Sequence, residues 1–234
     1  MNEKSDHLMN SNICIVIPAY NEEAVIGEVV KGIINCGYKD IIVIDDGSTD
    51  HTYDNARNAG ATAYRHKINR GKGAAVKTGL IASKITKAQV VVTMDGDGQH
   101  DPLDINKVIE PIVSGNIDVV LGTRMFIFKD ISFHKVLANK MANFLTRVLT
   151  GMWVSDSQSG FRAFDVKALD VLHDVGDKYE YDSEIIRQIA RNGLKCKEVP
   201  IRVYYTEYSL NKKHKQGIVN GVKTVYRLVW NIIS

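Results

Sequence analysis

Apolar residues along the first half of this chain occur in blocks of two kinds. Short runs rich in β-branched residues are apolar almost throughout, which is typical of strands covered on both faces of a sheet. We therefore expect strands at 13–17, 40–44, 61–65, 89–94 and 118–122.

Longer stretches between these runs carry apolar residues at helical spacing. They predict helices at 22–35, 72–85 and 101–114. Repeated strand–helix units indicate an α/β fold with a mostly parallel sheet and helices on both faces. Ligands bind beyond the carboxyl ends of such strands, so the residues that follow each strand are candidates for a site.

Beyond residue 124 the pattern is mainly helical. The spacing predicts helices at 131–150, 180–192 and 216–233, together with one strand at 194–204. No repeat, low-complexity tract or Pro/Gly-rich linker interrupts the sequence, which favours a single domain over the whole of 1–234.

The composition is that of an ordinary globular protein, with 234 residues, 44% hydrophobic and 24% charged. No stretch reaches the roughly 18 to 20 apolar residues of a membrane-spanning helix, and the first ten residues lack the apolar core of a signal peptide. Cys14, Cys36 and Cys196 lack the spacing of a zinc site or a disulfide framework. We therefore expect a cytoplasmic protein.

Charge is unevenly distributed along the chain. Residues 195–234 contain eight Lys or Arg and two Glu, so they carry +6, whereas the whole chain carries +3 and residues 1–194 carry −3. A basic end beside a mildly acidic body indicates that one end of the molecule meets an anionic surface or ligand. Nucleic acid and an acidic membrane both fit this charge.

Two common nucleotide-binding motifs are absent. The first predicted strand leads into PAYNEE (18–23) instead of GxGxxG, which argues against an NAD- or FAD-binding Rossmann protein. Around NRGKG (69–73), a P-loop would need Gly at 66, which is His, and Ser or Thr at 73, which is Gly, so a P-loop is excluded.

The second predicted strand ends in Asp45 and Asp46, within the segment DDGSTD. Asp, Ser and Thr form turns and cap helices, so this segment fits a structural turn. A carboxylate at this end of a strand also accepts hydrogen bonds from a ribose or a base. Taken alone, the segment leaves both interpretations open.

The fourth predicted strand ends in DGDGQHDP. Asp95 and Asp97 are two residues apart, so their carboxylates project the same way in an extended segment, and Gly96 and Gly98 let the backbone approach a ligand. With the amide oxygen of Gln99 they form an oxygen-only, incomplete shell that suits Mg²⁺ or Mn²⁺. The segment lacks the Gly and Glu of a calcium-binding EF-hand, whereas a solvated loop that caps the next helix stays an alternative.

Five segments occur in a fixed order, namely PAYNEE, DDGSTD, NRGKGAAV, MDGDGQHDP and the GTR of 122–124. They resemble the family 2 nucleotide-sugar glycosyltransferases with the GT-A fold, most of all the dolichol-phosphate mannose and glucose synthase group. The resemblance covers about 12–220. It implies a Rossmann-like GT-A sheet and a helical, basic C-terminal portion, with a nucleotide-sugar part at 12–124, an acceptor part at 125–220 and an amphipathic helix at 216–234.

The resemblance implies roles for the residues at the strand ends. Asp95 and Asp97 carry the divalent metal on the donor diphosphate, and Lys72 either assists them electrostatically or is an exposed helix residue. Asp95, Asp97 and Arg124 are expected to carry catalysis. The nucleoside is held by Pro18, Tyr20, Glu22, Asp45 and Asp46.

An acceptor phosphate is already ionised at neutral pH, so it needs cationic groups instead of a general base. Arg124, after the fifth predicted strand, can present a bidentate fork to phosphate. Lys135 and Asn139 lie where the family has an acceptor-phosphate Arg and Ser, so this chain departs from the family there. In the segment SGFRAF, Arg162 either reaches the acceptor phosphate or pairs with Asp156 in a structural loop.

A lipid acceptor requires contact with a membrane. The predicted helices at 131–150 and 216–233 place aromatic and aliphatic residues beside basic ones, as interfacial helices on an anionic leaflet do. We expect peripheral attachment to the inner face of the cell membrane. Packing of these helices on the sheet, or on a second subunit of an oligomer, is the alternative.

We therefore expect an inverting, metal-dependent glycosyltransferase that moves a sugar from UDP-N-acetylglucosamine, UDP-glucose or GDP-mannose to a polyprenyl (dolichyl) phosphate. Transfer to a sugar hydroxyl is one alternative, although the QxxRW motif common in such enzymes is absent. A non-catalytic nucleotide- or nucleic-acid-binding module is another, because Tyr204, Tyr205 and Tyr208 lie near lysines. A pure binder has no use for Asp95 and Asp97, so we expect no nucleic-acid partner.

Overall fold

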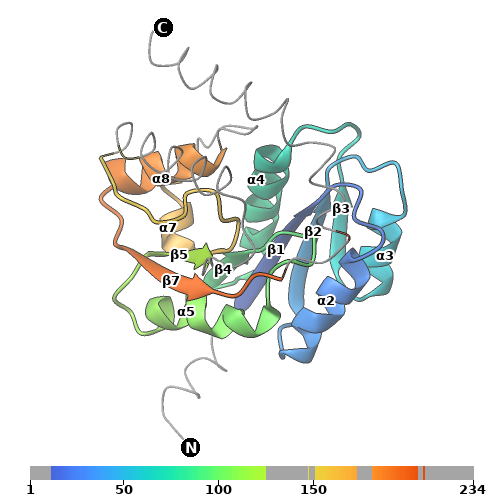
Figure 1. Cartoon of the computed structure of the whole chain (residues 1–234), viewed down its shortest axis with the longest axis horizontal. Helices are drawn as coiled ribbons and strands as arrows, with labels where there is room; N and C mark the ends of the chain where they lie inside the picture. Colours follow the sequence, from blue (N-terminus) through green and yellow to red (C-terminus); the bar gives the residue numbers. More distant parts are fainter. Residues whose placement is uncertain (1–11, 125–146, 148–150, 173–180, 205–207, 209–234) are drawn as a thin grey trace, which may run out of the picture.

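The computed structural model describes residues 12–124, 147, 151–172, 181–204 and 208 (Figure 1). The strands of the described residues are β1 (Ile13–Ala19), β2 (Asp40–Asp45), β3 (Thr62–Arg65), β4 (Val90–Thr93), β5 (Val119–Arg124), β6 (Arg162–Asp165) and β7 (Cys196–Ile201). They form one sheet in the order β3-β2-β1-β4-β6-β5-β7. The six strands expected from the sequence are confirmed, and β6 is an addition to them.

The sheet is mostly parallel, as expected, and β6 is the strand that runs the other way. It pairs antiparallel with β4 and β5, so that Arg162 lies opposite Thr93 and Leu121. An antiparallel strand begins at the edge where its parallel neighbours end. The segment that leads into β6 is therefore brought to the carboxyl-end edge of the sheet, where a ligand site is expected.

The predicted helices are confirmed where the structure describes them. The helical elements are α2 (Ile26–Asn35), α3 (Thr52–Asn58), α4 (Lys72–Ser83), η1 (Lys84–Thr86), η2 (Pro102–Asp104), α5 (Ile105–Val113), α7 (Val166–Leu169) and α8 (Tyr181–Arg191). The helix expected at 101–114 is divided into the 3-10 turn η2 and α5. The helices expected at 131–150 and 216–233 lie outside the described residues, apart from residue 147.

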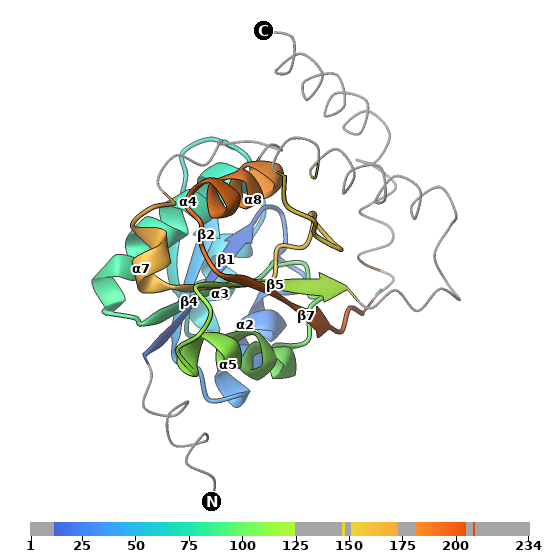
Figure 2. The ribbon, with the colours of Figure 1, turned by 90° about the vertical axis from the view of Figure 1, so that its left-hand side faces the viewer.

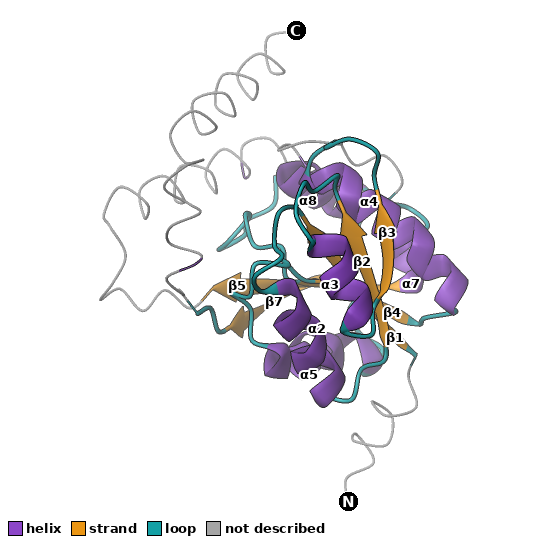
Figure 3. Cartoon of the chain, turned by 90° about the vertical axis from the view of Figure 1, so that its right-hand side faces the viewer, coloured by secondary structure: helices purple, strands orange, loops and turns teal. Residues whose placement is uncertain are grey.

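Helices cover both faces of the sheet. Helices α2, α3 and α5 pack on one face, and α4, α7 and α8 pack on the other (Figures 2 and 3). All seven residues of β1 are buried. Ile13, Ile15 and Ile17 join the core under α2 and α5, whereas Cys14 and Val16 join the core under α4 and α8. The strand is apolar throughout because each of its faces meets a helical layer.

Within the described residues, none of the helices combines the length and the apolar character needed to cross a membrane. Cys14, Cys36 and Cys196 are free thiols, in agreement with their spacing. Burial raises the pKa of Cys14 to about 11, so this thiol stays protonated and unreactive at neutral pH.

Candidate active site

Polar residues at the carboxyl ends of the parallel strands gather at one edge of the sheet. Asp45, the last residue of β2, is fully buried. Its carboxylate accepts the Ser48 N–H at 2.9 Å and pairs with the Arg65 guanidinium of β3 at 2.9 Å. Arg65 also donates to the Ser48 carbonyl at 2.6 Å. The buried charge of Asp45 is therefore compensated, and the ends of β2 and β3 are tied together.

Asp46 organises the loop that leads into α4. Its carboxylate accepts the backbone N–H groups of Arg70 and Gly71 at 3.0 and 2.7 Å. It also lies 2.7 Å from Nδ1 of His66, whose Nε2 is 3.0 Å from the Thr78 hydroxyl. These contacts fix the backbone immediately before the first turn of α4.

Lys72, the first residue of α4, reaches the end of β4. Its Nζ lies 2.8 Å from Oδ1 of Asp95, and its side chain is 38% exposed. Burial alone would lower the pKa of Lys72, but Asp95 and Asp182 raise it, so the lysine stays charged. Burial would likewise raise the pKa of Asp95, yet Lys72 and His100 outweigh it, and the pKa falls to about 2. Lys72 is therefore part of the acidic cluster and not a solvated helix residue.

Asp97 lies in the same loop as Asp95. Burial and the charge of Asp95 both raise the pKa of Asp97. Its Oδ1 accepts the backbone N–H of Gln99 at 3.0 Å, which folds the loop back on itself. On the other side, Nδ1 of His100 accepts the Asp95 N–H at 3.3 Å, and the His100 ring lies against Phe161 with centroids 5.2 Å apart. The loop thus holds two carboxylates close enough to repel each other.

Gly96 lies against the end of β1. A Cβ at this position would stand 3.1 Å from the carbonyl oxygen of Pro18 and 3.3 Å from Cβ of Ala19. In the structure Gly96 lets the loop approach β1, and its approach to a ligand stays a prediction. Pro18 therefore lies directly beside the loop that carries Asp95 and Asp97.

Asp95 has room only because residue 160 is glycine. A Cβ at Gly160 would overlap Oδ1 of Asp95 and stand 2.7 Å from its Cγ. The Thr93 hydroxyl donates to the Gly160 carbonyl at 2.8 Å, which pins this backbone to β4. The segment that leads into β6 is therefore one wall of the acidic cluster.

The loop after β1 meets α3 and a residue near the end of the chain. Glu22 is 8% exposed, and its N–H donates to the Thr52 hydroxyl at 2.7 Å. The Tyr208 hydroxyl lies 3.0 Å from Oε2 of Glu22 and 3.1 Å from the carbonyl oxygen of Asn21. Burial and the Glu22 charge raise the pKa of Tyr208, so the hydroxyl stays protonated and donates. Tyr20 is half-buried in the same loop.

The two arginines expected on the acceptor side form separate ion pairs. Arg124, at the end of β5, presents its fork to Asp156, with Nε and Nη2 each 2.6 Å from a carboxylate oxygen. Arg162 is 1% exposed and pairs with Asp182 of α8 at 2.8 Å. The alternative that Asp156 pairs with Arg162 is therefore wrong. Arg162 stands on β6 and turns toward α8, whereas Asp156 lies beside the end of β5.

Most of the residues predicted for the site lie along this edge of the sheet. They are Pro18, Tyr20, Glu22, Asp45, Asp46, Lys72, Asp95, Asp97, Gln99, Arg124 and Arg162. Lys135 and Asn139 lie outside the described residues. The ligand that each of these residues contacts stays a prediction.

The family model described as Glycosyl transferase family 2 matches residues 14–172, which include every strand end of this site. The chain belongs to glycosyltransferase family 2. The family expected from the five sequence segments is thereby confirmed.

Relatives of this transferase are known in archaea and bacteria. The UDP-N-acetylglucosamine–dolichyl-phosphate N-acetylglucosaminyltransferase of Methanococcus voltae is 39% identical, and the match covers 93% of this chain and 94% of that protein. The polyprenol monophosphomannose synthase of Mycolicibacterium smegmatis is 27% identical over 87% of this chain and 82% of that protein.

Solved structures confirm the GT-A fold of this transferase. The crystal structure of glucosyl-3-phosphoglycerate synthase from Mycobacterium tuberculosis, in complex with Mn²⁺, UDP-glucose and phosphoglyceric acid, matches with a TM-score of 0.69. It is 22% identical, and the match covers 95% of this chain and 82% of that one. The mostly parallel sheet and its two helical layers are therefore shared with an enzyme of known structure.

The acidic cluster of the transferase fits a divalent cation. Mg²⁺ and Mn²⁺ take carboxylate, amide and phosphate oxygens, and Asp95, Asp97 and Gln99 offer oxygens of the first two kinds. A cation would also relieve the repulsion that raises the pKa of Asp97. Among the residues described by the structure, no three His, Cys, Asp or Glu side chains converge into a preformed metal site. Asp95, Asp97 and Gln99 alone would therefore leave the coordination shell of such a cation incomplete.

Four residues of this edge are not predicted from the sequence. Arg65 ends β3 and His66 follows it, so inspection of the residues at the end of every strand would have found them. Gly160 and Asp182 give no comparable signal. Their place in the site depends on β6, which carries Arg162 between β4 and β5.

Proposed function

We propose that this transferase moves a sugar from a nucleotide-sugar donor to a polyprenyl (dolichyl) phosphate. The observation that carries the proposal is the 39% identity, over 93% of the chain, to a dolichyl-phosphate N-acetylglucosaminyltransferase. The paired carboxylates Asp95 and Asp97, with Lys72 beside them, support the donor half of the reaction. UDP-N-acetylglucosamine is accordingly the first donor to test, ahead of UDP-glucose and GDP-mannose.

The proposed reaction is one displacement at the anomeric carbon. A phosphate oxygen of the acceptor attacks C1, the bond from C1 to the donor diphosphate breaks, and the nucleoside diphosphate leaves, which inverts the configuration. The acceptor phosphate is already ionised, so no base has to remove a proton. Negative charge builds on the leaving diphosphate, and that is where the site has to stabilise the transition state.

The acidic loop and Lys72 are placed to stabilise the leaving group. Asp95, Asp97 and Gln99 would hold Mg²⁺ or Mn²⁺, which would supply positive charge at the diphosphate. Lys72, held 2.8 Å from Asp95, adds a second positive charge at the N-terminus of α4. That helix end itself favours an anion.

We assign the nucleoside to the loops after β1 and β2, and the acceptor phosphate to Arg124 at the end of β5. Glu22 is nearly buried in the first of these loops, and Asp46 fixes the backbone beside the second. Asp156 holds the Arg124 guanidinium by two bonds of 2.6 Å, which sets its plane in advance. Preorganisation of this kind lowers the entropic cost of positioning a reactant.

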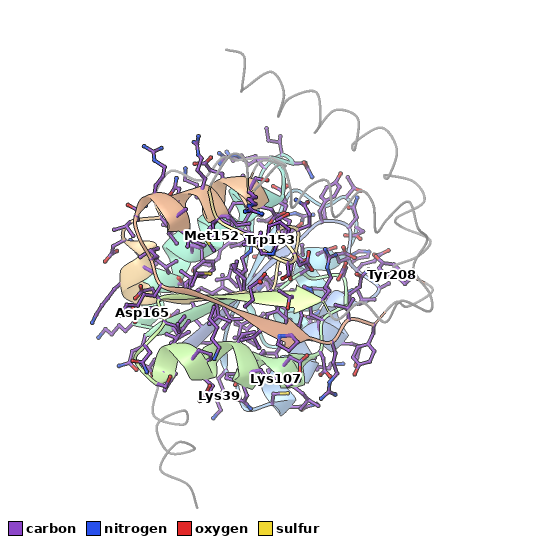
Figure 4. The ribbon with its side chains drawn as sticks, turned by 60° about the vertical axis from the view of Figure 1, so that its left-hand side comes forward. Lys39, Lys107, Met152, Trp153, Asp165 and Tyr208 are labelled. Carbon is purple, nitrogen blue, oxygen red and sulfur yellow. The ribbon has the colours of Figure 1, made fainter. Side chains whose placement is uncertain are left out.

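We also propose peripheral contact with an anionic membrane, with Trp153 at the contact. Trp153 is 60% exposed, and the Arg147 guanidinium lies 5.1 Å from its ring centroid. The next residue, Val154, is fully buried, so the loop that presents Trp153 is anchored. Figure 4 shows Trp153 on the α8 side of β5. An aromatic ring beside an arginine suits the headgroup region of a membrane. Asp156, three residues after Trp153, is hydrogen-bonded to Arg124, so this loop also reaches the proposed acceptor site.

The test is a transfer assay with purified protein and vesicles that contain dolichyl phosphate. UDP-N-acetylglucosamine, UDP-glucose and GDP-mannose are supplied separately, each with Mn²⁺, with Mg²⁺ and with EDTA, and the lipid extract is analysed by mass spectrometry. We expect one donor to give a lipid phosphate heavier by one sugar residue, and EDTA to abolish the product. Asp97→Asn should lose the product as well, whereas the exposed Asp54→Asn on α3 should retain it.

Other outcomes would contradict the proposal in distinct ways. Transfer of the sugar to a hydroxyl acceptor, with none to the lipid phosphate, would change the acceptor class. Full transfer in EDTA, or full activity of Asp97→Asn, would remove the metal from the mechanism. Binding of nucleotides without transfer to any acceptor would favour a non-catalytic module.

A further inference from the structure

Residues 202–204, which follow β7, run back along the loop that carries the acidic cluster, and we call them the strap. Val203 forms an antiparallel bridge with His100. The Tyr204 N–H donates to the Gln99 carbonyl at 2.8 Å. The strap is therefore hydrogen-bonded to Gln99 and His100, the residues of the loop that follow Asp97 in the sequence.

Two acidic residues fasten the strap. Asp104 is fully buried, and its carboxylate accepts the Arg202 N–H at 2.6 Å and pairs with Lys107 at 2.6 Å. Asp101 is 5% exposed, and its Oδ2 lies 3.0 Å from the Tyr204 hydroxyl and 3.3 Å from Nη1 of Arg202. A buried carboxylate is tolerated only when it is paired, so these contacts keep the strap and the turn η2 together.

The strap is bonded to Gln99 and His100, which in turn bond to Asp97 and Asp95. Gln99 donates its backbone N–H to Asp97, and the ring of His100 accepts the N–H of Asp95. Asp95 and Asp97 are like charges in one short loop, and their repulsion favours conformations that move them apart. A second line of hydrogen bonds along the loop opposes that movement.

We infer that Asp101 and Tyr204 are positioning residues that, through the strap, hold the acidic loop in the arrangement that binds a divalent cation. The inference rests on the proposed function, in which the cation sits at the donor diphosphate. Neither residue touches reacting atoms, because both act through Gln99 and His100. Loss of the Tyr204–Asp101 bond loosens the loop without unfolding the protein, since Tyr204 is 51% exposed.

Tyr204→Phe tests the inference because it removes only the hydroxyl. We expect the affinity for Mn²⁺, measured by electron paramagnetic resonance with and without UDP, to fall about three- to tenfold. This loss is somewhat smaller than the loss on removing a group that is bonded directly to a metal ligand. Amide hydrogen exchange over 97–101, measured without metal, should become faster. Tyr64→Phe is the matched control, because Tyr64 is 43% exposed and lies on β3, the edge strand farthest from β7 and the strap.

Asp101 offers a conservative pair of variants. Asp101→Asn keeps an oxygen that accepts the Leu103 N–H, and its amide NH₂ can donate to the Tyr204 hydroxyl oxygen in place of the lost acceptor, so it should retain more of the affinity for Mn²⁺ than Asp101→Ala. Asp101→Ala loses both bonds and should weaken Mn²⁺ binding at least as much as Tyr204→Phe. The double variant should bind no more weakly than Asp101→Ala, because both changes remove the same bond.

The outcomes separate this inference from the proposed function. If the wild type binds Mn²⁺ and both Tyr204→Phe and Asp101→Ala match Tyr64→Phe in affinity and exchange, the positioning role is overturned alone. If the wild type binds no Mn²⁺ with or without UDP, the metal site of the proposed function is overturned together with the inference.

Discussion

Replacement of Gly160 by alanine tests the geometry of the acidic cluster most directly. The new methyl group would overlap Oδ1 of Asp95 and stand 2.7 Å from Cγ, whereas ordinary contacts begin at 3.4 Å. Neither side yields easily, because the Gly160 carbonyl is bonded to Thr93 and Asp95 is bonded to Lys72. Asp95 has to retreat by about 1 Å, a displacement that can cost on the order of a hundredfold in rate.

We therefore expect kcat for sugar transfer to fall about a hundredfold in Gly160→Ala. Mn²⁺ affinity should fall with it, because Asp95 is one of the expected metal ligands. Overpacking of this kind also costs about 1–3 kcal/mol of stability. The assay is formation of the lipid-linked sugar at saturating donor and acceptor, accompanied by Mn²⁺ titration and thermal unfolding.

Gly27→Ala in α2 is the matched control. A Cβ at Gly27 would meet only the Asn55 carbonyl oxygen, at 3.9 Å. Alanine is favoured over glycine inside a helix by about 1 kcal/mol, so this variant should be stable and fully active. If Gly160→Ala transfers sugar and binds Mn²⁺ as well as Gly27→Ala does, the reasoning about Asp95 is refuted.

Two further predictions concern charge and the membrane. Lys72→Met should lower the free energy of unfolding, measured in EDTA at neutral pH, by about 1 kcal/mol. This value is small because solvent screens the half-exposed lysine and weakens its ion pair with Asp95. The pKa of Asp95 is about 2, below its ordinary value, so its contribution to stability is lost as the pH falls toward 2. Urea unfolding should therefore show the difference shrinking in acid, and a constant difference would contradict the ion pair. In a Trp230→Phe background Trp153 is the only tryptophan, and its emission should shift to the blue on phosphatidylglycerol vesicles but not on phosphatidylcholine. An unshifted spectrum from protein that sediments with the vesicles would contradict contact at Trp153.

The sequence predicts the centre of the sheet well because burial on two faces leaves a local signature. β1 and β4 are buried at every position, and their runs of Ile and Val are visible without any knowledge of their neighbours. β6 has no such signature, since it is only four residues long and begins with the buried Arg162. What stabilises it is its place between β4 and β5, which is not local information.

The strand-end carboxylates are predictable for the same reason, whereas their partners are not. Asp45 and Asp95 follow apolar runs, so the fold class alone places them at the ligand edge. Asp156 and Arg162 are close in the sequence and of opposite charge, yet Asp156 pairs with Arg124 and Arg162 with Asp182. The choice between partners depends on the order of strands in the sheet, which the sequence does not reveal.

The insertion of β6 between β4 and β5 also has a consequence during synthesis. β4 is buried at every position and pairs with β1 on one side only until β6 arrives on the other. While the chain emerges from the ribosome, that side stays open until residue 165 is available. A fragment limited to 12–124 would keep it open permanently, and open apolar strands recruit other chains into aggregates. We therefore expect residues 12–124 not to form a separable module, because the open side of β4 is covered by a strand from the second half of the chain.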